Sequence, residues 1–201
     1  MNKGVVCTMI KIRLRNRPYG FVYSNTLPSG GFTEIKIPVV AERVAVTGDY
    51  FEIADNHCAA ICTMNTLLIM RQQNKGDIGR HRFGNDYLQI FKDIHKIVGN
   101  GPIIFYKPKF NRFFKSKGSK LHAVPISTFS QIEAAIRDRV PVPMMVNAGI
   151  THWHWILVIG IRKYINGDIY LNILDGWNKR TDRYLKYTGR ETFIRALRPT
   201  I

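Results

Sequence analysis

This sequence contains three side chains that together could catalyse an acyl transfer. In chain order they supply a thiol nucleophile, a general base and an acid that orients the base. Cys58 stands in the segment NHCAA, His154 in HWHWILVIG and Asp175 in LDGW. A thiolate can attack a carbonyl carbon, an imidazole can take up and return the proton, and a carboxylate can hold the imidazole ring. Each of the three lies at the edge of a predicted helix or strand, where a rigid element can position it.

Cys58 is predicted to lie in the first turn of a helix. Asp55 or Asn56 offers a side-chain oxygen for the N-cap, and the apolar residues that follow have helical spacing: Ala60, Ile61, Met64, Leu67 and Leu68. A helix N-terminus lowers the pKa of a thiol, and its outward N–H groups can also receive an oxyanion. The alternative for Cys58 is a small buried hydrophobic residue, which is the usual role of an intracellular cysteine.

The other two cysteines are given no chemistry. Cys62 lies one turn further along the same helix face and is interpreted as a packing residue, while Cys7 has no partner pattern. Three cysteines without paired spacing argue against a disulfide framework and fit a reducing compartment. With no signal-peptide pattern at the N-terminus, a cytoplasmic location is expected if Met1 is the native start.

Two histidines, His152 and His154, compete for the role of general base. The nearly continuous apolar run 155–161 predicts a central strand covered on both faces, and alternation puts both histidines on the same face just before it. A histidine held at the edge of a sheet suits a general base, and a histidine without a role is the alternative for either one.

Asp175 directly follows the next predicted strand. Residues 168–174 form that strand, and residues 165–168 are predicted to form the hairpin turn before it. Antiparallel pairing would then bring the carboxylate beside the histidine, where it would fix the tautomer and stabilise the imidazolium. The alternative is an ordinary turn aspartate before Gly176.

These segments resemble a papain-like cysteine peptidase, and most closely the compact bacterial branch that includes peptidases cleaving bacteriocin leaders at double-glycine sites. The HWILVIG segment matches that pattern with His154 at the catalytic position, and residues 127–146 match the preceding helix and strand. The resemblance covers residues 51–201. It implies an α+β fold in which a central nucleophile helix packs on an antiparallel sheet. It also implies a hydrolase, a thiol protease with a peptide or protein substrate, a Cys58–His154–Asp175 triad and no cofactor.

One position departs from that pattern. Papain-like enzymes usually carry a glutamine about six residues before the cysteine, and here that position is Glu52. An ionised carboxylate would repel an oxyanion rather than stabilise it. Three interpretations follow: Asn56 serves as the donor instead, Glu52 is turned away, or the site is inactive.

The length of 201 residues and a hydrophobic content of 45% predict one domain, 1–201, with a β-rich N-terminal extension at 1–48 and a core at 49–201. Within the extension, a strand with a basic outer face is expected at residues 10–15, a hairpin or loop at 18–38 and one or two strands at 34–47. Further elements are a helix ending at Val98, a helix with a capping box at 130–133, and strands at 184–187 and 192–197. No apolar run is long enough to span a bilayer.

A net charge of +16 suggests binding to a negatively charged partner. Lysines and aromatic residues alternate through 106–120, a mixture that can follow a phosphate backbone; the alternative is that the aromatic residues dock on the core and the lysines stay in water. An acidic polymer, an acidic protein or nucleic acid would fit the charge, and no motif singles out nucleic acid. No metal is predicted, because neither a Cys-x-x-Cys nor a His-Glu-x-x-His spacing is present.

Two functions other than peptide hydrolysis remain open. The same three residues can transfer an acyl group to an amine instead of water, as in transglutaminase-like and arylamine acetyltransferase-like enzymes. A catalytically inactive papain-like domain that serves as a basic binding module is the second alternative, and Glu52 is the residue that favours it.

Overall fold

The fold is built around the long strand β5, which carries His154 and pairs along both edges. A computed structural model describes residues 19–75, 77–147, 152–189 and 192–201. In it, β5 (Trp153–Tyr164) pairs with β4 (Val142–Asn147) and β2 (Phe32–Lys36) along one edge and with β6 (Ile169–Leu174) along the other. Because β5 is covered on both faces, its nearly continuous apolar sequence is the one expected of a central strand.

Eight strands of the described chain form one antiparallel sheet. Their order is β1-β7-β6-β5-β4-β8-β3, and β2 joins it at β5. The remaining strands are β1 (Val22–Tyr23), β7 (Arg183–Lys186), β8 (Arg195–Thr200) and β3 (His122–Ile126). The ends of the described chain therefore meet in one sheet, since β1 occupies one edge while β8 lies next to the other.

Gly160 allows β2 to lie close against β5. A Cβ atom added at Gly160 would come within 2.9 Å of the main-chain oxygen of Ile35 in β2 and 3.2 Å of the Asn172 side chain in β6. The register of β5 against β6 also shifts between Val158 and Gly160. The glycine at the end of the HWILVIG segment is thus required by a close main-chain approach.

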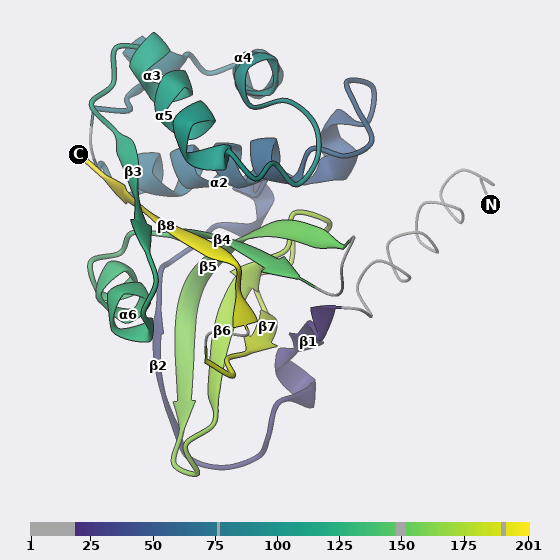
Figure 1. Ribbon diagram of the computed structural model, residues 1–201, viewed down its shortest axis with the longest axis vertical. Helices are drawn as coiled ribbons and strands as arrows, with labels where there is room; N and C mark the ends of the chain where they lie inside the picture. The colour runs from purple at the N-terminus through teal and green to yellow at the C-terminus, as the bar shows by residue number, and fades with distance from the viewer. Residues whose placement is uncertain (1–18, 76, 148–151, 190–191) are drawn as a thin grey trace, which may run out of the picture.

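A layer of helices covers one end of the sheet (Figure 1). The central helix α2 packs against β5 and β4 on one side and α4 on the other, and α5 packs against α4 and β3. Helix α6 flanks the sheet beside β2, β4 and β5. The helices are α2 (Cys58–Gln72), α3 (Arg80–Phe83), α4 (Tyr87–Val98), α5 (Tyr106–Ser116) and α6 (Phe129–Arg137).

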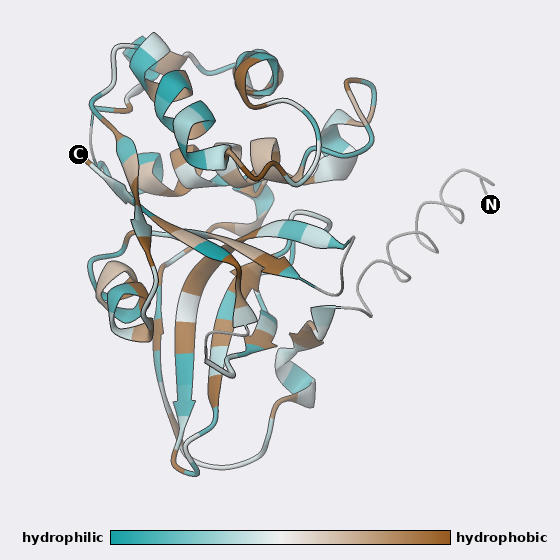
Figure 2. Cartoon of the chain, viewed as in Figure 1, coloured by the Kyte–Doolittle hydropathy of each residue, from teal (hydrophilic) through white to brown (hydrophobic). Residues whose placement is uncertain are grey.

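Every residue of α2 from Cys58 to Met70 is buried, so this helix is the axis of the hydrophobic core. Around it lie the aromatic residues of α5 and the apolar residues of β4, β5 and β6, and Figure 2 shows the hydrophobic residues concentrated along these strands. None of the helices in the described part of the chain has the length and apolar character that crossing a bilayer requires.

The fold class predicted from the sequence is confirmed: a helical part with a central helix packs on an antiparallel sheet in an α+β arrangement. In the described part of the N-terminal extension, residues 19–48, β1 and β2 are strands of the central sheet. Residues 37–47, expected to be strand, instead include the 3-10 helix Ala41–Arg43 and the start of another at Thr47–Tyr50, and a third 3-10 helix covers Ser24–Thr26. The strand expected at residues 10–15 lies outside the described residues.

Several element ends differ from the sequence prediction. The capping box of α6 is formed by Thr128 with Gln131, two residues before the predicted one, since Thr128 is the residue with extended backbone before the first turn. The last strand begins at Arg195, three residues later than expected. The helix ending at Val98 and the hairpin turn at 165–168 are confirmed, with Tyr164 N–H donating to the Asp168 carbonyl at 2.8 Å.

Candidate active site

His154 lies inside β5 rather than just before it, and its ring is buried. Its Nε2 atom is 2.7 Å from the main-chain carbonyl oxygen of Asp175. A carbonyl oxygen can only accept a hydrogen bond, so Nε2 must carry the proton that it donates. The neutral ring therefore has its lone pair on Nδ1, which makes Nδ1 the basic nitrogen.

Aromatic side chains surround the His154 ring. Trp177 stacks on it with ring centroids 4.0 Å apart and an angle of 16° between the planes. Tyr19 and Phe21 pack nearby, with centroids 5.5 Å and 6.4 Å from the imidazole. These three rings limit the rotation of the imidazole and keep water from the Nε2 hydrogen bond. Sequence reasoning assigned them no role; the one signal was the position of Trp177, two residues after Asp175.

The carboxylate of Asp175 organises the turn that follows β6. Its oxygens accept hydrogen bonds from the main-chain N–H groups of Trp177 at 2.8 Å and Asn178 at 3.2 Å, and from the Asn178 amide at 2.8 Å. The guanidinium of Arg183 approaches the carboxylate at 3.4 Å, and both side chains are almost fully buried. Burial raises the pKa of the Asp175 carboxyl, while Arg183 and the N–H donors act in the opposite direction.

Asp175 thus reaches His154 through its main chain, while its carboxylate holds Trp177 against the ring through the turn. The expected contact between the carboxylate and the imidazole remains a prediction. Antiparallel pairing of β5 with β6, Leu157 opposite Leu174, accounts for the approach of these two segments as the sequence anticipated.

Cys58 is the first residue of α2, and its side chain is buried. The predicted cap was wrong, because the N-cap residue is His57, and no side chain forms a cap hydrogen bond there. Helix geometry leaves the first N–H groups of α2 without acceptors inside the helix. Cys58 therefore lies at a helix N-terminus, as the sequence predicted for a reactive thiol, and no side chain caps that N-terminus.

The start of α2 is attached to the Asp175 turn by a short series of contacts. The His57 ring donates from Nε2 to the Thr47 carbonyl at 3.3 Å, and the Thr47 N–H donates to the Gly176 carbonyl at 2.8 Å. A Cβ added at Gly176, which has φ +74°, would lie 3.1 Å from the Ile61 side chain in the first turn of α2. These contacts place the first turn of α2 beside the turn that orients His154.

Cys62 attaches the second turn of α2 to the same strand as His154. Its thiol donates to the main-chain oxygen of Ile156, two residues beyond His154, at 3.3 Å. Burial raises the pKa of the Cys62 thiol far above its usual range. Cys62 is therefore a packing residue, as the sequence indicated. Neither Cys58 nor Cys62 forms a disulfide in the described part of the chain, and Cys7 lies outside it.

The remaining candidates lie on the surface. His152 is exposed, whereas His154 is buried, which favours His154 as the histidine of the site. Glu52 and Asn56 are also exposed, and the Asn56 carbonyl accepts a hydrogen bond from the Gly101 N–H at 2.5 Å. In the described part of the chain, no three histidine, cysteine or acidic side chains gather in a group that could hold a metal ion.

No family model matches the sequence, and no curated protein matches it. Among solved structures, the chain is similar to the bromelain protease from Ananas comosus in complex with the E64 inhibitor. The two are 14% identical with a TM-score of 0.43, and the similarity covers 90% of this chain and 99% of that chain.

Proposed function

We propose that this protein is a papain-like cysteine peptidase in which Cys58 is the nucleophile and His154 the general base. The observation that carries the proposal is the hydrogen bond from His154 Nε2 to the Asp175 carbonyl. It fixes the tautomer whose lone pair is on Nδ1, on a buried ring next to the turn that contacts the start of α2. Fixing the neutral tautomer is the task that the third residue of a catalytic triad performs.

In the proposed reaction, the Cys58 thiol gives its proton to His154 Nδ1, and the thiolate attacks the carbonyl carbon of a peptide bond. The first N–H groups of α2 stabilise the oxyanion. The C–N bond breaks as His154 returns the proton to the leaving amine, leaving a thioester on Cys58. Water attacks the thioester, with His154 again taking up a proton, and the carboxylic acid product and free thiol are released. No cofactor is needed.

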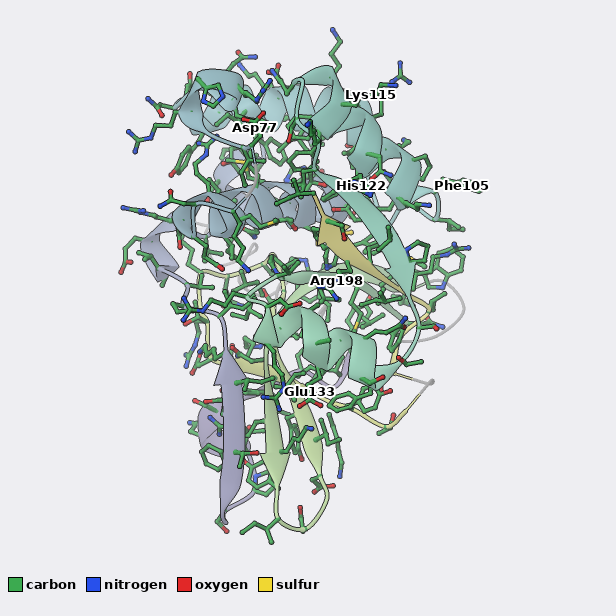
Figure 3. All side chains as sticks on the ribbon, turned by 90° about the vertical axis from the view of Figure 1, so that its left-hand side faces the viewer. Asp77, Phe105, Lys115, His122, Glu133 and Arg198 are labelled. Carbon is green, nitrogen blue, oxygen red and sulfur yellow. The ribbon has the colours of Figure 1, made fainter. Side chains whose placement is uncertain are left out.

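An apolar groove offers a place for a substrate side chain. It has a volume of about 270 Å³, and its lining includes Trp155, which follows His154 in β5, together with Ile104, Phe105 and Ile194. Phe105 is 73% exposed and points away from the body of the protein at the start of α5 (Figure 3). Large apolar side chains exposed around a groove are typical of recognition surfaces. We infer that this groove accepts an apolar side chain of the substrate.

The decisive experiment uses a peptide carrying a thiol-directed electrophile, followed by mass spectrometry of the labelled residue. The expected result is a single adduct on Cys58 at pH 6, with labelling reduced at least tenfold in His154→Ala and unchanged in His152→Ala. Equal slow labelling of Cys58 and Cys62 in the folded protein would contradict the proposal.

An inactive papain-like binding module is the second candidate, and Glu52 favours it because a carboxylate stands where these enzymes carry an oxyanion donor. If Glu52 lies beside the oxyanion, Glu52→Gln should speed acyl-enzyme formation by about a hundredfold, the value of one restored donor. Because the Glu52 side chain is exposed, we instead expect a change below threefold. The inactive module would be supported if neither the wild type nor Glu52→Gln formed an acyl-enzyme.

A further inference from the structure

A cluster of arginines and a lysine lies at the far end of α2 from Cys58. Two neighbouring cavities of about 730 Å³ and 470 Å³ share Arg43 and Gln72 in their walls. The larger cavity adds Arg71 and Arg80, and the smaller adds Lys75 and Arg139. We name this pair of cavities the basic groove. Its cations come from segments well separated in the sequence that the fold brings together.

No aspartate or glutamate of the described chain lines either cavity. Of the acids nearest in sequence, Asp86 caps α4 through the N–H groups of Leu88 and Gln89, Asp77 pairs with Arg82, and Asp138 pairs with Arg198. Glu42, the neighbour of Arg43, is exposed and lines neither cavity. The arginines of the groove thus differ from six others of the described chain that pair with a carboxylate: Arg82, Arg137, Arg162, Arg180, Arg183 and Arg198.

Arg71 is held in place by neutral groups. Its Nε and Nη1 atoms donate to the main-chain oxygens of Ile78 and Gly84, both at 3.2 Å, and neither oxygen compensates its charge. Burial lowers the pKa of Arg71, and the positive charge of Arg80 adds to that effect. The fixed guanidinium contributes its field to the groove, and no carboxylate among the described residues pairs with it.

Polar atoms at the groove also lack hydrogen-bond partners among the described residues. Arg71 Nη2 and both polar atoms of the Gln73 amide are buried and unsatisfied. Buried polar groups without a partner are costly and rare in folded proteins. Their occurrence together at this groove is a second observation, independent of the charge, that points to a missing ligand.

We propose that the basic groove binds a small linear polyphosphate anion, either inorganic polyphosphate or the phosphate chain of a nucleotide. Guanidinium groups match phosphate oxygens in bidentate geometry, and two connected cavities suit an extended anion better than a single phosphate. Single-stranded nucleic acid needs aromatic side chains on which successive bases stack, and Tyr87 is the one aromatic residue that lines these two cavities in the described chain.

The site is separate from the proposed catalytic centre. Arg71 lies thirteen residues after Cys58 in α2, a distance of about 20 Å along the helix. Binding at the basic groove therefore does not depend on peptidase activity, and it can be measured in a Cys58→Ala variant.

The test is isothermal titration of the full chain with inorganic tripolyphosphate at fixed ionic strength. Arg43 and Arg80 are exposed, so Arg43→Ala and Arg80→Ala should fold normally, which thermal unfolding verifies. Arg112, an exposed arginine of α5 outside both cavities, provides the matched control with the same charge change. We expect the affinity to fall at least tenfold in each groove variant, to change less than twofold in Arg112→Ala, and to be unchanged in Cys58→Ala.

A second arm compares ATP with tripolyphosphate. Tighter binding of ATP that is lost in Tyr87→Ala would identify a nucleotide as the ligand, and equal binding would identify the phosphate chain alone. The proposal is overturned if tripolyphosphate does not bind, or if Arg112→Ala weakens binding as much as the groove variants. It is also overturned if a single-stranded oligonucleotide binds through these arginines and tripolyphosphate does not.

Discussion

At the scale of the residue, the histidine of the site is oriented by a main-chain carbonyl and a stacked indole. A carbonyl oxygen fixes the tautomer as well as a carboxylate does, but it places no negative charge beside the ring. The carboxylate of Asp175 is instead paired with buried Arg183 and the N–H groups of the turn. We infer that Asp175 acts on the histidine chiefly by shaping the turn.

Removal of the Asp175 carboxylate should therefore affect stability and activity together. Asp175→Ala leaves Arg183 buried without a counter-charge, so we expect the free energy of unfolding to fall on the order of 3 kcal/mol, measured by urea denaturation. Asp175→Ala combined with Arg183→Met should recover part of that loss. The pairing of Asp175 with Arg183 would be contradicted if Arg183→Met did not reduce the loss of stability caused by Asp175→Ala.

The two thiols of α2 should differ strongly in reactivity with iodoacetamide. Cys58 lies in the first turn at a helix N-terminus, whereas burial raises the pKa of Cys62 far above its usual range. We expect Cys58 to be alkylated at pH 6 at least a hundredfold faster than Cys62, as measured by peptide mass spectrometry. Comparable rates in the native protein would show that the helix terminus does not activate Cys58.

At the scale of the element, α2 and β5 form the frame of the site. The first turn of α2 contacts the Asp175 turn through Ile61 and Gly176, and its second turn contacts β5 through Cys62. Because every residue from Cys58 to Met70 is buried, the helix cannot rotate without disrupting the core. The position of the candidate nucleophile is thus set by packing along the whole helix.

The close contact of β2 with β5 should be sensitive to a single methyl group. Gly160→Ala would place a Cβ within 2.9 Å of the Ile35 carbonyl oxygen, so the two strands would have to separate. We expect a loss of about 1–3 kcal/mol of stability, measured by thermal unfolding. Gly48→Ala, at a glycine where an added Cβ meets nothing within 4 Å, should change stability little. Equal effects at both positions would contradict the close approach.

At the scale of the whole molecule, positive charge and apolar contacts are distributed over different surfaces. In the basic segment 106–120, the aromatic residues Tyr106, Phe110, Phe113 and Phe114 are buried, which confirms that they dock α5 on the core. Lys107 and Lys115 of the same helix stay exposed, whereas Lys109 is half-buried and donates to the Val98 carbonyl at 2.8 Å. The excess charge of this segment lies on the outer face of α5, apart from the arginines of the basic groove.

Buried His57 should make stability depend on pH. Burial lowers its pKa from 6.5, and neighbouring His95 adds to that effect while Asp55 opposes it. The folded state thus binds the proton less readily than the unfolded state, so this contribution to stability is present above pH 6.5 and is lost as the pH falls. Urea unfolding between pH 8 and pH 5 should show a decline that is smaller in His57→Gln and unchanged in His122→Ala, which alters an exposed histidine. An equal decline in His57→Gln would exclude His57 as its cause.

Four features of the fold could be predicted from the sequence: the helix that follows Cys58, the strand that carries His154, the hairpin at 165–168 and the helix that ends at Val98. These features depend on hydrophobic periodicity and turn residues, which act between near neighbours in the chain. The docking of α5 could also be anticipated, because its aromatic residues recur at helical spacing.

The contacts between these elements could not be predicted, because they arise from packing in three dimensions. Three sets of contacts join residues that are far apart in the chain. The Asp175 carbonyl meets His154, Tyr19 and Phe21 pack beside the imidazole, and β2 lies against Gly160. The basic groove likewise combines arginines from separate segments. No local pattern encodes such contacts, because they depend on how whole helices and strands pack, and packing determines whether a side chain or the main chain of a given residue meets its partner.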